Sequence, residues 1–192
     1  MIESPLSHNG NRLYVITGPP GCGKTTLCNG LSDKGYYTMP EIARPLIRAN
    51  MESNGPLPWT DFVEFQQKIM QVQNGLEATI SQLNGPVYLD RGLPDTLGYY
   101  LEREVREGKK VPEHIVDAVS KRRYAGVLIL DPLSIYQTDG QRKEGEEMMR
   151  EIHKQLHAAY RRVGYEPLRV PALDKIPRLE FVLDKTLNTH SK

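Results

Sequence analysis

The stretch GPPGCGKT, from Gly18 to Thr25, carries the clearest chemistry of the chain. It fits the pattern G-x-x-x-x-G-K-[ST], in which a glycine-rich turn wraps backbone amides around phosphate groups. Pro19 and Pro20 have no N–H to donate, so we expect the donors to be the amides of residues 21–26, at the start of a helix. The stretch therefore predicts a binding site for a nucleoside polyphosphate.

Each side chain of this phosphate loop has an expected task. The Lys24 ammonium should reach the β- and γ-phosphates, and the Thr25 hydroxyl should be a ligand of Mg²⁺. Gly21 and Gly23 permit backbone angles and close approaches that a Cβ would block. The predicted nucleotide-binding residues are Gly18, Gly21, Cys22, Gly23, Lys24, Thr25 and Thr26.

Charged side chains follow three further apolar segments that we expect to be strands. They are Glu41 after 36–39, Asp90 and Arg91 after 87–89, and Asp131 after 127–130. Because ligands collect at the carboxyl ends of parallel strands, we expect these groups to converge with the phosphate loop. For Asp131 alone, a turn formed with Pro132 is the simpler interpretation.

Asp90 has two interpretations. An acid at the end of an apolar strand is the setting of the carboxylate that holds Mg²⁺, directly or through water, in phosphate-loop enzymes. The alternative is a cap for the helix that we expect from Pro94. We assign Thr25 and Asp90 to a metal site, and we expect Arg91 to neutralise charge on the phosphates.

Glu41, Arg44 and Arg48 form a second candidate group, predicted to bind the acceptor together with Asp95. The spacing i, i+3, i+7 puts the first three on one helical face, with Glu41 as a base or substrate ligand and the arginines as partners of an anionic substrate. The alternative is a surface ion pair, which contributes little to stability. Asp95 and Tyr99 lie one turn apart and could line the same cleft, although Tyr99 could equally pack in the core.

The apolar pattern predicts alternating strands and helices around these groups. We expect strands at 13–16, 36–39, 87–89, 127–130 and 168–170, and helices after the phosphate loop, from 41, 60, 94, 112 and 141, and over 176–187. Thr60 should cap the third helix, and residues 138–141 form a candidate capping box. The expected apolar stripe of the third helix is Phe62, Phe65, Ile69, Val72, Leu76, Ile80 and Leu83. Strands separated by helices give a parallel sheet covered on both faces.

Composition limits the class of protein. The 192 residues suffice for one domain, which we expect over 12–190 after a flexible N-terminus at 1–11. The formal charge of +1 gives no electrostatic footprint for nucleic acid. There is no apolar run of about eighteen residues and no signal-peptide pattern, so we expect a cytoplasmic protein without a membrane span. Cys22 and Cys28, with no nearby histidine, predict neither a disulfide framework nor a zinc site.

Several segments occur in an order that resembles a known family. Besides the phosphate loop and Glu41, they are YLDRGLPD at 88–95, IYQTDGQRKE at 135–144 and YRRVGYEPLRVP at 160–171. Together they resemble a family of small predicted P-loop ATPases of the AAA type, grouped with the ribosylnicotinamide-kinase-like proteins, over nearly the whole chain. The resemblance implies a three-layer α/β fold of the nucleotide-kinase type, with a parallel sheet in the order 2-3-1-4-5.

More distantly, the layout is similar to that of deoxynucleoside kinases. In that family a glutamate after the second strand is the catalytic base, an acid–arginine pair ends the third strand, and a mobile lid brings arginines to the phosphates. The resemblance thus implies Glu41 as the base, Asp90 and Arg91 as the pair, and a lid over about 135–150 that carries Arg142.

This chain departs from the deoxynucleoside kinases in two ways. Gly92 stands where those kinases have serine, and Lys143 follows Arg142 in place of a denser arginine cluster. Gly140 and Gly145 could absorb the backbone rotation of a closing lid. The simpler alternative for Arg142 is a surface ion pair with Glu146.

The sequence predicts ATP- and Mg²⁺-dependent phosphoryl transfer to a small-molecule acceptor, with a helical insertion at about 41–84 shaping the acceptor pocket. Its predicted catalytic residues are Lys24, Glu41, Asp90, Arg91 and Arg142. The alternative is a regulatory nucleotide-binding switch that hydrolyses ATP or GTP slowly and binds a protein or lipid partner. A guanine switch of the Ras type is disfavoured, because the sequence contains no [NT]-K-x-D segment.

Overall fold

Short apolar runs form a central sheet, and the amphipathic segments between them form helices. The computed structural model describes residues 11–80, 83–121, 124–133 and 140–187, with the backbone alone at 11 and 140–144. The strands are β1 (Asn11–Thr17), β2 (Tyr37–Met39), β3 (Gly85–Asp90), β4 (Gly126–Leu130) and β5 (Leu168–Val170). The helices are α1 (Lys24–Asp33), α2 (Ala43–Ser53), α3 (Phe62–Ile80), α4 (Pro94–Glu107), α5 (Glu113–Ser120), α6 (Gly140–Arg162) and α7 (Lys175–Leu187).

The strands of the sheet all run parallel, in the order β2-β3-β1-β4-β5. Central β1 pairs with both neighbours through Val15, which lies opposite Leu89 of β3 and Val127 of β4. Each of these side chains is buried, as expected for a parallel sheet that is covered on both faces. The three-layer α/β fold of the nucleotide-kinase type and its strand order, as predicted from the sequence, are confirmed.

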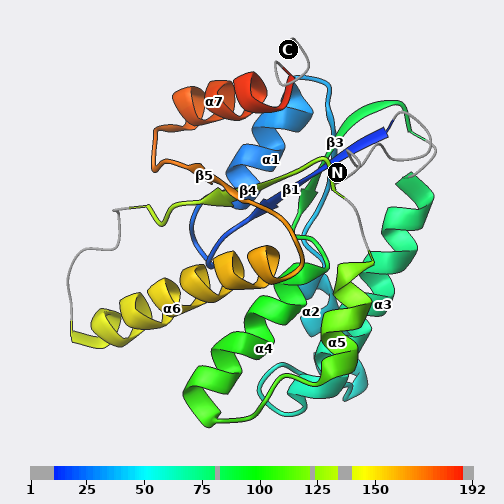
Figure 1. Cartoon of the computed structure of the whole chain (residues 1–192), viewed down its shortest axis with the longest axis vertical. Helices are drawn as coiled ribbons and strands as arrows, with labels where there is room; N and C mark the ends of the chain where they lie inside the picture. The colour runs from blue at the N-terminus through cyan, green and yellow to red at the C-terminus, as the bar shows by residue number, and fades with distance from the viewer. Residues whose placement is uncertain (1–10, 81–82, 122–123, 134–139, 188–192) are drawn as a thin grey trace.

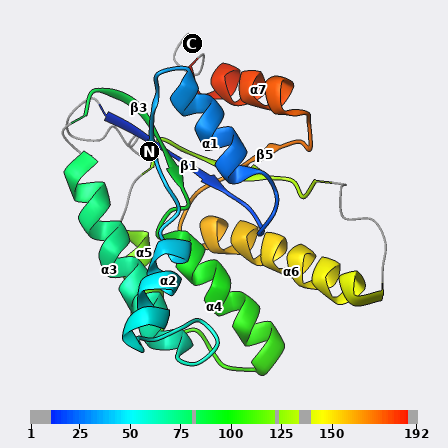
Figure 2. The same cartoon turned by 180° about the vertical axis from the view of Figure 1, so that it is seen from behind.

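Helices cover both faces of this sheet (Figure 1, Figure 2). On one face α1 and α7 pack against each other, and Ile16 of β1 shares a core cluster with Val182 of α7. On the other face, Val15 packs in a cluster with Tyr160 of α6. A smaller cluster joins α4 to α5 and α6 around Leu97. Alternate residues of β1 thus hold opposite layers together, and the carboxyl ends of the strands stay free to carry a site.

Helix α3 has a different cap from the one predicted. Asp61 caps it, because the Asp61 Oδ1 accepts the N–H of Glu64 at 3.1 Å. The Thr60 hydroxyl oxygen instead accepts the N–H of Leu57, one turn earlier. Neighbouring residues of equal capping ability compete for this position, and the sequence does not decide between them.

The buried face of α3 also differs from the predicted stripe. Val72 and Leu76 are 39% and 38% exposed, whereas Gln66, Gln73 and Glu77 are buried. The predicted stripe further included Leu83, which lies beyond the end of the helix at Ile80. The helix is rotated so that polar side chains face the interior, and this face belongs to the site described below.

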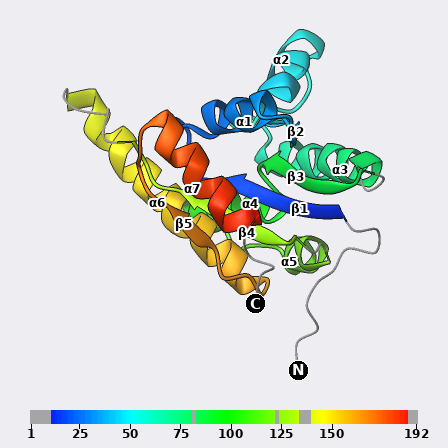
Figure 3. The same ribbon diagram turned by 90° about the horizontal axis from the view of Figure 1, so that it is seen from above.

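Other parts of the predicted layout fall at or beyond the limits of the described residues. Residue 11, expected in a flexible N-terminus, is the first residue of β1, and residues 1–10 lie outside the described part of the chain. So do most of the candidate capping box and positions 135–139 of the predicted lid. Residues 140–150 form the first turns of α6, which extend beyond the rest of the molecule (Figure 3).

Three further properties of the described residues complete the fold. No helix among them is long and apolar enough to cross a lipid bilayer. Trp59, the only tryptophan of the chain, lies in the connection between α2 and α3 with 66% of its surface exposed. Cys22 and Cys28 are buried free thiols.

Candidate active site

The phosphate loop joins β1 to α1 in a conformation that requires glycine. Gly18 and Gly23 have φ angles of 147° and 90°, and a Cβ on Gly18 would lie 2.8 Å from the Cys22 Sγ. The N–H of Leu27 donates to the Gly23 carbonyl at 3.0 Å and so makes the first bond of α1. The amides of residues 24–26 precede that bond and have no acceptor within the helix, which leaves them as donors for an anion.

The Lys24 side chain lies folded against its own loop. Its Nζ donates to the carbonyls of Gly18 and Pro19 at 3.0 Å each, and the residue is only 6% exposed. Burial lowers the pKa of Lys24, and the neighbouring Arg91 guanidinium lowers it further. A phosphate oxygen would offer this ammonium an anionic acceptor in place of two neutral ones, and charged acceptors make the stronger hydrogen bonds.

A cavity of about 680 Å³ opens beside the phosphate loop. Its walls come from the loop, from the segment between β2 and α2, and from α3, α4 and α6. The sequence-predicted residues that line it are Gly21, Gly23, Lys24, Thr25, Thr26, Glu41, Arg44, Asp90, Arg91 and Asp95. Groups that follow β1, β2 and β3 therefore meet at one edge of the sheet, whereas Gly18, Cys22, Arg48 and Asp131 are not among the lining residues.

Asp90 is a buried carboxyl at the end of β3. It is 2% exposed, and its Oδ1 has no hydrogen bond within the described residues. Burial raises its pKa to about 6, although the Lys24 and Arg91 cations act in the opposite direction. The alternative role as a cap of α4 is not what the structure shows, because the cap position of that helix is Leu93.

Thr25 and Asp90 fit the needs of Mg²⁺. Both line the cavity, Thr25 is exposed at the loop, and Asp90 has the orphaned oxygen. Mg²⁺ prefers oxygen ligands and is usually held by one or two protein groups together with water and phosphates. A Mg²⁺ site of this kind does not require a cluster of three or more acidic, histidine or cysteine side chains. The described residues contain no such cluster.

Arg91 occupies the centre of the charged wall in an unusual backbone conformation. Its φ is 81°, and its N–H donates to the Ile16 carbonyl at 3.0 Å. The guanidinium contacts Asp95 at 2.8 Å through Nη1 and lies 3.8 Å from the Glu41 carboxylate through Nε. It also stacks 5.5 Å from the centre of the Tyr99 ring. Left-handed backbone at a non-glycine residue is characteristic of functional sites and persists only where the surroundings hold it.

Asp95 is the main support of Arg91. Its carboxylate accepts hydrogen bonds from Arg91, from the Thr17 hydroxyl at 2.6 Å, from the Gly92 N–H at 3.2 Å and from the Tyr160 hydroxyl at 2.5 Å. From the sequence we expected Asp95 to bind the phosphoryl acceptor, which stays a prediction; in the structure these four bonds involve both of its oxygens. The geometry makes Asp95 a residue that positions Arg91, and it links the arginine to β1 and α6.

Glu41 lies in the segment between β2 and α2. Because α2 begins at Ala43, Glu41 does not share a helical face with Arg44 and Arg48, as the spacing had predicted. Arg44 still reaches it, with Nε 3.1 Å from Glu41 Oε2, while Arg48 is exposed. Glu41 is 17% exposed and lies between two guanidinium groups, those of Arg44 and Arg91.

Two glutamines on the buried face of α3 were missed by sequence analysis. Gln73 donates to Glu77 at 2.8 Å and to the Arg91 carbonyl at 3.2 Å, so it helps to hold the left-handed arginine. Gln66 lines the cavity and is 5% exposed, yet its amide has no hydrogen bond within the described residues. Spacing of three and four residues from Phe62 and Ile69 was the available signal, since it places both amides on the apolar face.

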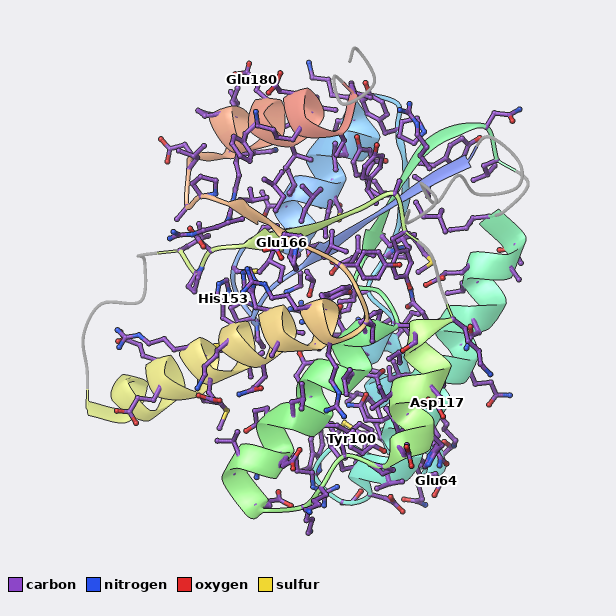
Figure 4. All side chains as sticks on the ribbon, in the orientation of Figure 1. Glu64, Tyr100, Asp117, His153, Glu166 and Glu180 are labelled. Atoms are coloured by element: carbon purple, nitrogen blue, oxygen red, sulfur yellow. The ribbon has the colours of Figure 1, made fainter. Side chains whose placement is uncertain are left out.

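A further buried polar group lies on the other side of the phosphate loop. Asp131 directly follows β4, and both of its carboxylate oxygens accept a hydrogen bond from the Nε of Arg169 at 2.8 Å. His153 points from α6 toward the sheet, with Nε2 4.0 Å from Asp131 (Figure 4). Arg178 of α7 is 4% exposed and donates to the Cys22 carbonyl of the phosphate loop. No local motif marks Arg178, so sequence analysis did not find it.

Arg142, the predicted lid arginine, lies in the first turn of α6. Its side chain is outside the described residues, and so are the neighbouring side chains at 140–144. Its catalytic role therefore stays a prediction.

Residues 13–175 match a family described as AAA domain. The chain belongs to this family. That membership bears out the resemblance to small P-loop ATPases inferred from the sequence. No curated protein is similar enough to match this AAA-domain protein.

Solved structures similar to this AAA-domain protein include P-loop kinases. Deoxyadenosine kinase from M. mycoides aligns with a TM-score of 0.66 at 18% identity, over 92% of this chain and 99% of that one. Thymidylate kinase from Ehrlichia chaffeensis aligns with a TM-score of 0.62 at 14% identity, over 93% and 99% of the two chains. NadR protein in complex with NR aligns with 0.69 at 16% identity, over 95% of this chain and 52% of NadR. At these identities the likeness shows a common fold.

Proposed function

We propose that this AAA-domain protein is a kinase that transfers a phosphoryl group from ATP to a small-molecule acceptor with the help of Mg²⁺. The observation that supports this most is the cavity in which the phosphate loop, the buried Asp90 and the Glu41–Arg91 pair meet. A site for ATP hydrolysis alone needs no large apolar chamber beside the phosphates. Kinases that share the fold add support, because those named above act on nucleosides or nucleotides by their names.

The phosphate loop binds and orients the polyphosphate in this proposal. The free amides of residues 24–26 donate to phosphate oxygens, and Lys24 leaves its two carbonyl partners to contact the transferring group. Thr25 and Asp90 would hold Mg²⁺, and the ion would supply positive charge beside the phosphate oxygens. Arg91 adds a second fixed cation, held in place by Asp95 before any ligand arrives.

Glu41 is the proposed base. It follows β2, is mostly buried, and lines the cavity beside Arg91. In the transfer step the acceptor hydroxyl oxygen attacks the γ-phosphorus, its proton passes to the Glu41 carboxylate, and the bond from phosphorus to ADP breaks. Arg44 and Arg91 fix the direction of that carboxylate from two sides.

The acceptor pocket lies between α3 and α4. Phe62, Phe65 and Ile69 supply an apolar wall, and Gln66 places in it an amide that has no hydrogen bond to any described residue. Glu102 lines the same chamber and is paired with Arg106 at 2.9 Å. An acceptor with an apolar body and one hydrogen-bonding group opposite Gln66 fits these walls, because ligand pockets combine mostly apolar walls with a few polar groups that fix the orientation of the ligand.

The experiment is to incubate the protein with ATP, Mg²⁺ and a metabolite extract, and to find by mass spectrometry the species that gain one phosphoryl group. The parent should produce such a species, and Lys24→Met should not. Glu41→Gln keeps the shape of the side chain but cannot accept the proton, so it should slow transfer by roughly 10²–10⁴ while the Kd for ATP changes little. Slow ATP hydrolysis by the parent, with no phosphorylated species, would favour the regulatory switch instead.

The proposal includes a lid over about 135–150 with Arg142 as its charge-neutralising residue. An arginine that acts on the transferring group contributes about 10³–10⁵ in rate. In single-turnover reactions we expect Arg142→Ala to approach the lower end of that loss, since Lys143 can substitute in part. A rate close to that of the parent, also in Arg142→Ala combined with Lys143→Ala, would leave α6 without a catalytic role.

A further inference from the structure

Arg178 on α7 is a buried cation that the proposed chemistry does not use. Its Nη1 donates to the Cys22 carbonyl at 2.6 Å, and its Nη2 donates to the Asp131 carbonyl at 2.8 Å and the Val170 carbonyl at 3.5 Å. One guanidinium thus joins the phosphate loop to the carboxyl ends of β4 and β5. Such a three-way contact at the ligand edge of the sheet calls for an explanation beyond the packing of α7.

The described partners of Arg178 are all neutral carbonyls. The nearby Asp131 carboxylate accepts Arg169 on both oxygens, so its charge is already paired, and Arg178 has no ion pair within the described residues. Its buried Nε also has no hydrogen bond there. Burial lowers the pKa of Arg178, but a guanidinium stays charged in proteins. Among the described residues, this buried guanidinium therefore forms no ion pair, and Asp131, the carboxylate that acts on it, is already paired with Arg169.

The bond from Arg178 to Cys22 also fixes the direction of a donor. In a trans peptide the C=O and the N–H point in opposite directions, so a Cys22 carbonyl held toward Arg178 turns the Gly23 N–H away from it. A Cβ at Gly23 would lie 3.2 Å from Nη1, which shows how closely the guanidinium packs against this peptide. The Gly23 N–H therefore points away from Arg178, and Gly23 lines the cavity beside the phosphate loop.

We propose that Arg178 is a positioning residue of the nucleotide site. It holds the Gly23 amide in the direction of the phosphates, and its buried charge is countered when a nucleoside polyphosphate fills the loop. This inference rests on the proposed binding of ATP. It requires that replacing Arg178 weaken the binding of ligands with several phosphates more than the binding of a nucleoside, because both effects act on phosphate oxygens.

The test compares Arg178→Met with Arg169→Met, two arginines at the same edge of the sheet. Arg169 is 74% exposed and contacts the Asp131 side chain, whereas Arg178 contacts the backbone of the loop. Calorimetric titration should show that Arg178→Met weakens binding of ATP and of inorganic tripolyphosphate by at least about tenfold. Binding of adenosine should be unchanged, and Arg169→Met should bind ATP within about twofold of the parent.

Arg178→Lys supplies a second variant, which also serves if Arg178→Met does not fold. A single ammonium keeps the charge but cannot reach the Cys22 and Asp131 carbonyls as a fork, so we expect an affinity for ATP between those of the parent and Arg178→Met. A folded Arg178→Met or Arg178→Lys that is less heat-stable but binds ATP as the parent does would make Arg178 purely structural and overturn the inference. Failure of the parent itself to bind ATP would overturn the proposed function and this inference together.

Discussion

Asp90 combines burial with an oxygen that has no partner among the described residues, and this makes its ionisation costly in the folded protein. Its pKa is raised from 3.8 to about 6 by burial, against the pull of Lys24 and Arg91. Between these two values the folded chain binds more protons than the unfolded chain does. The contribution of Asp90 to the free energy of unfolding therefore falls as the pH rises from about 4 to about 6. This cost of ionising Asp90 is offset when a metal ion binds its carboxylate.

Asp90→Asn should remove this dependence on pH. We expect the free energy of unfolding of the variant, relative to that of the parent, to rise between about pH 4 and about pH 6 and then level off, by up to about 3 kcal/mol in total. Urea unfolding from about pH 4.5 to about pH 7.5 measures it. Asp117→Asn, on the exposed side of α5 (Figure 4), controls for the loss of a carboxylate elsewhere. A constant difference between Asp90→Asn and the parent would contradict the shifted pKa.

At the scale of the element, α3 carries two buried glutamines with opposite surroundings. Gln73 donates to Glu77 and to the Arg91 carbonyl, while Gln66 faces the cavity without a hydrogen bond to any described residue. They lie two turns apart on one helix face. Replacing each glutamine with leucine therefore compares an amide that stabilises the fold with an amide that faces the cavity.

We expect Gln73→Leu to lower the free energy of unfolding by about 1–3 kcal/mol, because it removes two hydrogen bonds of a buried amide, one of them to the Arg91 carbonyl. Gln66→Leu should leave stability unchanged or raise it, since no hydrogen bond to a described residue is lost on a largely apolar wall. Urea titrations of both variants, with exposed Gln67→Leu as a reference for helix propensity, give the comparison. Equal losses for Gln66→Leu and Gln73→Leu would contradict the assignment of the Gln66 amide to the pocket.

The same helix shows where inference from sequence stops. Its existence and approximate start follow from the spacing of Phe62, Phe65 and Ile69, but its cap and buried face do not. Thr60 and Asp61 are both good caps, and only the folded chain shows which one bonds. The buried face was predicted wrongly because Val72 and Leu76 are apolar but exposed. Which face is buried depends on the hydrogen bond that Gln73 makes in the interior, to Glu77.

At the scale of the whole molecule, the helices on both faces are connected through one sheet. Tyr14 of β1 donates to the Thr186 carbonyl of α7 on one face, and on the other face Thr17 of β1 and Tyr160 of α6 both donate to Asp95 of α4. We therefore expect a single cooperative unfolding transition, with calorimetric and van't Hoff enthalpies that agree. ATP with Mg²⁺ should raise its midpoint in the parent but not in Lys24→Met. Two separate transitions would show that a layer unfolds by itself.

The topology of the parallel sheet also explains why part of the site could be predicted from the sequence. The phosphate loop is a local motif, and ligands bind at the carboxyl edge of a parallel sheet, so the strand pattern alone is enough to bring Glu41 and Asp90 to the loop. Arg178 and Tyr160 act across 156 and 65 residues of sequence, on Cys22 and Asp95 respectively. Contacts of that range depend on how helices dock on the sheet, and a single sequence carries no local sign of them.

The lone tryptophan gives the protein an optical signal of its own. Trp59 is 66% exposed in the connection that leads into α3, next to Pro58 of the cavity wall, so its indole emits from an aqueous environment. Nucleotide that occupies only the phosphate loop would leave this emission unchanged. An acceptor, or a closing movement of the connection, would shift it toward the blue and protect it from iodide quenching. The order in which the two proposed substrates bind can thus be followed in real time without attaching a dye.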